Sequence, residues 1–243
     1  MSVPLGLRDK RLRGPDTLAQ NVDDDPRGPK RFGWLTAPTV THGNLLVFLI
    51  AGYVAFCVMY LGSAAVSRTA VELTPTAVDR ALPFIGASIF VYLSQFVLLP
   101  YALVIARDDQ SRSQGFYSML LATLFAVVIF VCYPTSLMRP TPPADGLLGL
   151  IWRGLHLADT SSNVFPSLHV ALAAISGAVL WQAKRRVLAI AWPMLISIST
   201  LTTRQHIVWD VAGGLLLALV AWRFTLAFVS YERTHAPDRS ASR

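Results

Sequence analysis

The sequence predicts an all-α integral membrane protein, built as a bundle of about six transmembrane helices. Of its 243 residues, 53% are hydrophobic and only 14% are charged, whereas about a quarter of the residues in a typical soluble domain are charged. The apolar residues also gather in long runs, and a helix needs about 17–25 such residues to cross a bilayer. A soluble helical protein is the alternative, but its helices carry one apolar stripe and not a fully apolar surface.

Six runs approach or exceed the length of a membrane span. They are residues 44–66, 82–106, 116–134, 165–183, 187–203 and 207–230, of which the fifth is the shortest. Together they predict one membrane domain over residues 43–230.

The two ends of the chain differ from this domain. Residues 1–42 are rich in charged residues, Pro and Gly and contain no apolar stretch of the kind that a signal peptide has. Segments of this composition bury too little apolar surface to fold. We therefore expect a disordered, basic, cytoplasmic arm at 1–42 and a cytoplasmic tail at 231–243.

The basic residues predict the orientation in the membrane. If the N-terminus is cytoplasmic, 16 of the 21 Lys and Arg residues lie inside, and the five outside are Arg68, Arg80, Arg139, Arg153 and Arg204. The positive-inside rule then predicts a multi-pass protein of the cell membrane with both termini in the cytoplasm. This distribution accounts for the net charge of +7, and no basic groove with interleaved aromatic residues indicates nucleic-acid binding.

Three polar segments then reach the outer membrane surface. "SLMRPTPP" follows the third span, "FPSLH" opens the fourth, and "RQHIVWD" leads from the fifth into the sixth. Ionisable residues at membrane depth are costly and mark functional sites. The candidate site residues in these segments are Arg139, Ser167, His169, Arg204, His206 and Asp210.

His206 and Asp210 predict a nucleophile. Residues four apart share one face of a helix. The carboxylate can accept the proton of one imidazole nitrogen, which leaves the other nitrogen free to attack. A His–Asp pair also stabilises helices without any chemistry, so this pair alone leaves both interpretations open.

The remaining polar residues predict binding of a phosphate group. Pro166 is favoured in a first helical turn, where free N–H groups and the helix dipole favour an anion. The Ser167 hydroxyl adds a donor, and His169 can protonate a leaving oxygen. Arg139 and Arg204 carry planar guanidinium groups that suit phosphate oxygens, although contact with lipid headgroups is the alternative for each. The whole set is typical of phosphoryl transfer, in which fixed donors and cations stabilise the charge.

The order of these motifs, RP, then PSLH, then HIVWD, resembles the type 2 phosphatidic acid phosphatase superfamily. That family has the pattern KxxxxxxRP, PSGH and SRxxxxxHxxxD on six membrane helices, and the resemblance covers roughly residues 116–230. It implies that His206 attacks phosphorus to form a phosphohistidine, that Asp210 orients it, and that His169 is the acid for the leaving group. It further implies that Arg139 and Ser167 bind the phosphate.

The chain departs from this pattern at three positions. Cys132 stands in place of the motif lysine, Thr200 in place of the arginine after Ser199, and Leu168 in place of the glycine. Two phosphate-binding cations are thus missing from their expected places, and Arg204 is a candidate to replace one. PSLH without that lysine resembles the branch that contains the inositol phosphorylceramide synthases, which exchange lipid headgroups.

The sequence therefore predicts a membrane lipid phosphatase or phosphotransferase with its active site at the outer face. We expect no cofactor and no metal ion, because arginines supply the positive charge. The expected substrate is a lipid phosphate or phospholipid among the membrane lipids, with water or an alcohol such as inositol as acceptor, and the oligomeric state stays open. The alternative is a membrane transporter or binding protein for an anionic lipid or phosphate, although the sequence shows no repeat of its halves. A scaffold of a membrane complex would leave the histidines without a role.

Overall fold

The computed structural model describes residues 34–66, 69–141, 146–159 and 162–231. Each predicted apolar run coincides with a helix or with successive helices, and the all-α prediction is confirmed. The second run consists of a 3-10 turn and two consecutive helices. The elements are α2 (Leu45–Val66), η1 (Gly86–Ser88), α4 (Ile89–Leu93), α5 (Gln95–Val104), α6 (Asp109–Cys132), α8 (Leu168–Gln182), α9 (Arg186–Thr202) and α10 (Val208–Phe228).

Among the described residues, four helical segments are long and apolar enough to cross a membrane. They are Leu45–Ala65, Gly86–Val104, Asp109–Cys132 and Val208–Phe228, whereas α8 and α9 are shorter apolar helices. The number of six spans therefore stays a prediction. The third segment begins at Asp109 rather than at residue 116, because the Asp108 side chain caps the helix by accepting a hydrogen bond from the Ser111 N–H at 2.7 Å.

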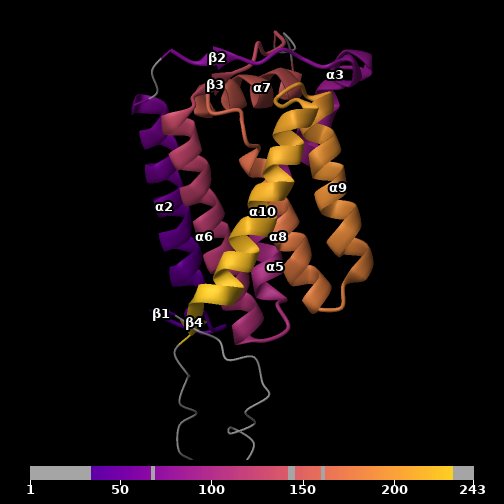
Figure 1. Ribbon diagram of the computed structural model, residues 1–243. Coiled ribbons are helices and arrows are strands. Elements are labelled where there is room, and N and C mark those ends of the chain that lie inside the picture. The colour runs from indigo at the N-terminus through magenta and orange to yellow at the C-terminus, as the bar shows by residue number, and fades with distance from the viewer. Residues whose placement is uncertain (1–33, 67–68, 142–145, 160–161, 232–243) are drawn as a thin grey trace, which may run out of the picture. The chain divides into compact units, whose positions relative to one another are not determined.

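Short elements lie at the two ends of the helices (Figure 1). One end carries α3 (Ala77–Ala81), α7 (Gly146–Ala158) and the parallel pair of β2 (Val71–Glu72) with β3 (Thr135–Ser136). At the other end, β1 (Leu35–Ala37) pairs in parallel with β4 (Val229–Tyr231), so the two ends of the described chain lie side by side. Residues 34–42 thus include a strand where the sequence predicted disorder, and the rest of the predicted arm and nearly all of the tail lie outside the described residues.

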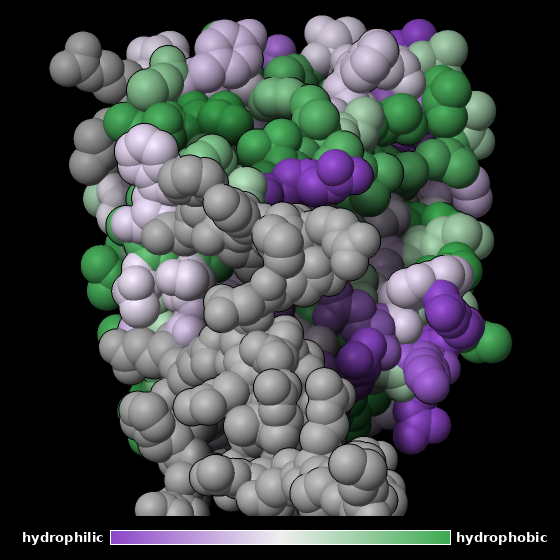
Figure 2. Space-filling view, turned by 60° about the horizontal axis from the view of Figure 1, so that its bottom comes forward, coloured by the Kyte–Doolittle hydropathy of each residue, from purple (hydrophilic) through white to green (hydrophobic). Residues whose placement is uncertain are grey.

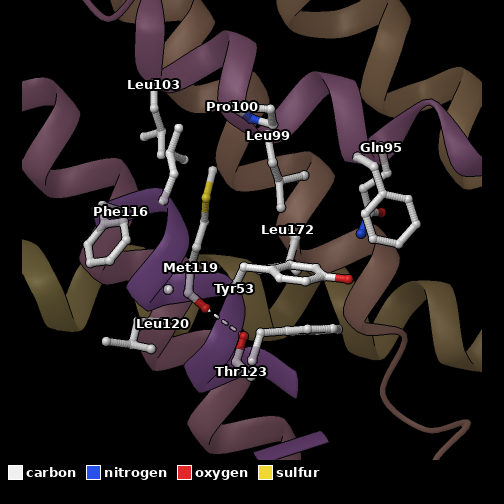
Figure 3. A pocket seen from close by; sticks show the side chains of 14 residues that line it. Tyr53, Gln95, Leu99, Pro100, Leu103, Phe116, Met119, Leu120, Thr123 and Leu172 are labelled. Carbon is white, nitrogen blue, oxygen red and sulfur yellow. Dashed lines mark hydrogen bonds between the residues drawn. The ribbon is translucent and has the colours of Figure 1, made fainter. Parts of the chain in front are cut away.

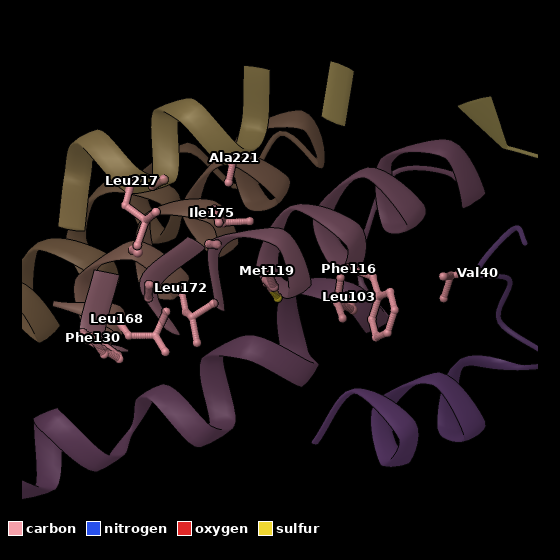
Figure 4. Close-up of a cluster of buried hydrophobic side chains, with 14 of the residues drawn as sticks. Val40, Leu103, Phe116, Met119, Phe130, Leu168, Leu172, Ile175, Leu217 and Ala221 are labelled. Atoms are coloured by element: carbon pink, nitrogen blue, oxygen red, sulfur yellow. The ribbon is translucent and has the colours of Figure 1, made fainter. Parts of the chain in front are cut away.

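Helix α8 is the centre of the bundle and packs against α5, α6, α9 and α10. Its apolar side chains join those of α6 and α10 in a buried cluster, in which Figure 4 shows Phe130, Leu172, Ile175 and Leu217. Gly214 of α10 faces the start of α8, where a Cβ atom would lie only 2.4 Å from the carbonyl oxygen of Ser167. The glycine therefore permits the close crossing of the two helices that carry the polar motifs.

The outer faces of the helices are apolar. On α2 the exposed fractions reach 69% for Leu46 and 68% for Val58. Figure 2 shows hydrophobic side chains on the flank of the bundle and hydrophilic ones gathered toward the end turned to the viewer. Extended apolar surfaces of this kind mark contact with a membrane.

Candidate active site

The segments with the two predicted histidines meet at the end of the bundle that holds α7. The backbone N–H of Ser167 donates to the backbone oxygen of Asp210 at 3.0 Å. The ring centroids of His169 and His206 lie 6.3 Å apart. The N-termini of α8 and α10 are therefore neighbours, and both helix dipoles favour an anion between them.

Asp210 lies beside one nitrogen of His206. The distance from His206 Nδ1 to Asp210 Oδ2 is 3.5 Å, somewhat longer than a normal hydrogen bond. Asp210 is fully buried, and its Oδ2 also accepts a hydrogen bond from the Ile207 N–H at 2.8 Å, which holds the carboxylate in place. Since Nδ1 faces the carboxylate, Nε2 is the nitrogen of His206 that is left for a reaction.

His169 is held in a similar way by a residue that the sequence analysis did not select. The hydroxyl of Tyr92 lies 3.2 Å from His169 Nδ1, and the two rings stack with centroids 4.1 Å apart. His169 Nε2 is buried and has no hydrogen-bond partner among the described residues. In each histidine, Nδ1 thus lies beside a polar neighbour: that of His169 is within hydrogen-bond distance of Tyr92, whereas that of His206 faces Asp210 at 3.5 Å without forming a hydrogen bond among the described residues.

The start of α8 differs from the prediction in one respect. Pro166 precedes the N-cap residue Ser167, and the helix begins at Leu168, so the placement of Pro166 in the first turn is wrong. The buried Ser167 hydroxyl accepts a hydrogen bond from the Val170 N–H at 3.4 Å, which leaves its own proton free to donate. In the part of the chain that the structure describes, the N–H groups of Leu168 and His169 have no acceptor. Such groups suit phosphate oxygens.

Arg139 forms an ion pair with Asp159, which follows α7. Its two terminal nitrogens donate to the backbone oxygen of Asp159 at 2.7 Å and to Oδ2 at 3.0 Å. The carboxylate also accepts a hydrogen bond from the Tyr60 hydroxyl. The side chains of Arg139 and Asp159 are only 10% and 14% exposed, and Arg139 Nε has no partner among the described residues. Asp159 therefore orients the guanidinium and leaves the Nε–H among the donors that remain for a ligand.

A third histidine lies near this ion pair. Burial lowers the pKa of His156 in α7, the positive charge of Arg139 lowers it further, and Asp159 opposes this effect. His156 is therefore neutral at pH 7. Its Nε2 is buried and unpaired among the described residues.

Arg204 is not brought into contact with the other candidates. It is exposed, and its φ of +51° places it in the left-handed turn that ends α9. No hydrogen bond or ion pair joins its guanidinium to any described residue. The Thr200 carbonyl accepts from the N–H groups of Gln205 at 3.0 Å and of His206 at 3.2 Å. This turn thus sets the backbone position of His206.

Thr200, which stands where the family pattern has an arginine, does not face the site. Thr200 is fully buried, and its hydroxyl donates to the backbone oxygen of Ser197 at 2.7 Å. It therefore cannot replace an arginine as a phosphate ligand.

Sequence reasoning missed four residues that support the site: Tyr60, Asp79, Tyr92 and Asp159. Asp79 Oδ1 accepts a hydrogen bond from the Val208 N–H at 2.9 Å and so holds the start of α10. Asp159 carried a detectable signal, since it is an acidic residue in a predicted outer loop. Tyrosines are common in apolar spans, so nothing in the sequence was a reason to select Tyr60 or Tyr92.

A cavity of about 590 Å³ opens beside Tyr60, Asp159 and His169. Asp159 and His169 supply polar groups to its lining, whereas the remaining lining includes many apolar side chains of α2, α7 and α8. Within the described ranges, no group of three or more His, Cys, Asp or Glu side chains could hold a metal ion.

Comparison with known proteins agrees with this arrangement. The family model of the PAP2 superfamily matches residues 79–224, which include all six predicted site residues and more than half of the chain. Neither the curated proteins nor the solved structures contain a match. Given this match and its apolar helices, the chain is a membrane protein that belongs to the PAP2 superfamily, whose members are phosphatase-like enzymes acting on phosphate-containing, lipid-like substrates.

Proposed function

We propose that this protein is an integral membrane lipid phosphatase or phosphotransferase that acts through a phosphohistidine on His206. The observation that carries the proposal is the pairing of the two histidines. Asp210 lies 3.5 Å from His206 Nδ1, and the ring of His169 lies 6.3 Å away with one nitrogen unpaired. A nucleophile with its orienting carboxylate, facing a separate acid, is the set that covalent phosphoryl transfer requires.

In the proposed first step, His206 Nε2 attacks phosphorus and the bond to the lipid oxygen breaks. His169 donates its proton to that oxygen, so the lipid leaves as a neutral alcohol. In the second step, water or an alcohol gives a proton to His169 while its oxygen attacks the phosphohistidine. This attack releases phosphate or a phosphorylated alcohol and restores His206.

The proposed phosphate ligands are Arg139, Ser167, Arg204 and the free N–H groups at the start of α8. Arg139 Nε is unpaired among the described residues, although its terminal nitrogens are held by Asp159. Fixed donors of this kind stabilise the charge on the transferred group. Arg204 is exposed on the turn before His206, so its guanidinium is free to reach an incoming phosphate.

The choice of acceptor distinguishes hydrolysis from transfer. The chain has PSLH in place of PSGH and Cys132 in place of the motif lysine, and this supports the branch that exchanges lipid headgroups. Purified protein incubated with labelled lipid phosphates and inositol phospholipids, with and without alcohol acceptors, tests the proposal. A hydrolase releases inorganic phosphate, and a transferase yields a phosphorylated alcohol. If every lipid is bound but none is turned over, the transporter or binding-protein alternative is correct.

Replacing Arg139 or Arg204 with alanine tests the two proposed phosphate-binding arginines. We expect Arg139→Ala to lower kcat/KM by about 10²–10³-fold, the effect of removing one fixed donor to a developing charge. For Arg204→Ala we expect a loss of roughly tenfold or more, since a hydrogen bond to a charged group contributes about 1.5–3 kcal/mol. Thermal unfolding is measured as a control, because Arg139→Ala also removes the positive charge that is paired with the Asp159 carboxylate. Full activity of Arg204→Ala excludes that arginine from the site.

Cysteine labelling tests the proposed orientation, in which both termini are cytoplasmic and the site faces outward. The pairing of β1 with β4, which brings the two ends of the described chain together, supports this orientation. In a background with Cys57→Ala and Cys132→Ala, Met138→Cys and Val187→Cys provide matched sites, since these side chains are 80% and 77% exposed. An impermeant maleimide should label Met138→Cys in sealed cells and Val187→Cys only after permeabilisation. The opposite pattern would place the site in the cytoplasm.

A further inference from the structure

Two adjoining cavities form an apolar groove that ends at the candidate active site. The cavity with His169 and Asp159 has a volume of about 590 Å³, and a second of about 510 Å³ lies between α2, α5, α6 and α8 (Figure 3). Leu99, Leu103 and Met119 contribute to the largely apolar lining of the second cavity. The residues that line both cavities are Tyr53, Phe56, Gln95, Phe96 and Leu172.

Gln95 stands at the junction of the two cavities with an unused amide. It is only 4% exposed, and its Oε1 is buried without a hydrogen-bond partner. No hydrogen bond joins its side chain to any of the described residues. Figure 3 shows Gln95 among the side chains that line the second cavity. A buried amide without partners is costly and rare in native proteins.

Two other buried glutamines differ from Gln95. The Oε1 of Gln205 also lacks a partner, but its Nε2 donates to the Thr203 backbone oxygen at 3.5 Å and it lines neither cavity. Gln114 is 3% exposed, but its Nε2 donates to the Trp222 backbone oxygen at 3.1 Å and its Oε1 accepts from the Tyr231 hydroxyl at 3.1 Å. Gln114 therefore has a structural explanation within the fold. Gln95 lacks one and faces a cavity large enough for a ligand.

Gln95 shares a cavity with the proposed acid of the site. Gln95 and His169 line the same cavity. Gln95 is the chain neighbour of Phe96, whose ring lies edge-on to His169 with centroids 6.5 Å apart. A lipid whose phosphate lies at His169 and whose chain extends into the second cavity therefore passes the Gln95 amide.

We propose that Gln95 hydrogen-bonds a hydroxyl or amide group that the lipid substrate carries next to its phosphate. This inference rests on the proposed function and names the substrate class of the same site. A hydroxyl or amide both donates and accepts hydrogen bonds, as the Gln95 amide requires. The lipid chain fills the apolar groove beyond it. A polyisoprenoid phosphate is apolar along its whole chain and would leave the Gln95 amide unpaired.

Matched lipids test the inference on the full chain. Monoacylglycerol phosphate carries a free hydroxyl next to its phosphate, and acylpropanediol phosphate differs only by lacking this hydroxyl. Geranylgeranyl phosphate represents the polyisoprenoids. We expect the wild-type protein to prefer monoacylglycerol phosphate over the other two by about tenfold in kcat/KM, the effect of one hydrogen bond. Gln95→Leu should remove this preference, whereas Gln114→Leu should lower stability and leave the preference unchanged.

The results separate this inference from the proposed function. Equal turnover of the three lipids by the wild type, or a preference that survives in Gln95→Leu, overturns the inference while the enzymatic function stands. Lipid binding is also measured as a shift of thermal unfolding. If monoacylglycerol phosphate is bound through Gln95 but never turned over, the inference stands and the proposed function is wrong.

Discussion

Replacing His206 with alanine is expected to abolish the phosphorylated enzyme with every substrate. His206 is the proposed nucleophile, and Asp210 lies 3.5 Å from its Nδ1, which leaves Nε2 to attack. Turnover should fall by at least about 10⁴-fold, the scale seen when one member of a catalytic group is removed. Rapid acid quenching after addition of a phosphorus-labelled lipid phosphate reads the acid-labile label on the protein directly.

Asp210→Asn is the matched variant for this experiment. Asparagine has nearly the size of aspartate and can still accept a hydrogen bond from the Ile207 N–H. The backbone at the start of α10 should therefore keep its conformation. The missing charge should slow the labelling of His206 without abolishing it. Label at the wild-type level in His206→Ala would refute the assignment of the nucleophile, whichever lipid is the natural substrate.

Replacing His169 with alanine should slow turnover in a way that depends on the leaving group. His169 is the proposed acid for the departing alcohol, and its Nε2 is unpaired among the described residues. General acid catalysis contributes about 10²–10⁴-fold for a poor leaving group. A lipid alcohol should therefore be released far more slowly, whereas nitrophenolate should leave at nearly the wild-type rate. Rates of phosphoenzyme formation from a lipid phosphate and a nitrophenyl phosphate provide the comparison.

Tyr92→Phe is the control for the His169 variant. It keeps the ring that stacks on His169 at 4.1 Å and removes the hydroxyl that lies 3.2 Å from Nδ1. We expect a smaller loss with the same dependence on the leaving group. An equal loss for both leaving groups in His169→Ala would mean that this histidine binds or packs and does not transfer a proton.

The positions of the apolar helices follow from the sequence. Runs of apolar residues long enough to cross a bilayer are a local property, so the segments near 44–66 and 207–230 could be found without knowing their neighbours. The encounter of "FPSLH" with "RQHIVWD" could also be expected, because alternating spans bring every second connection to the same side. The structure places His169 and His206 with ring centroids 6.3 Å apart, in agreement with this expectation.

The partners of the motif residues could not be derived in this way. Tyr92 reaches His169 across 77 positions of the chain, and Tyr60 reaches Asp159 across 99. Such pairs depend on the rotation and crossing of whole helices, which composition does not encode. Close crossings depend on single small residues such as Gly214, whose importance appears only when the opposing backbone is known.

The sequence by itself therefore determined that this protein is a helical membrane protein with a PAP2-type set of polar motifs. Hydrophobicity and motif spacing are local properties that depend only on the order of the residues. Only the tertiary structure decided which hydrogen-bonding groups are already occupied. Thr200 bonds within its own helix, Arg139 is held by Asp159, and Arg204 stands apart in a turn. Gln95 faces a cavity with its Oε1 unpaired, whereas Gln114 is hydrogen-bonded within the fold. The physical reason is that hydrogen bonds act over about 3 Å, and only folding brings distant segments that close.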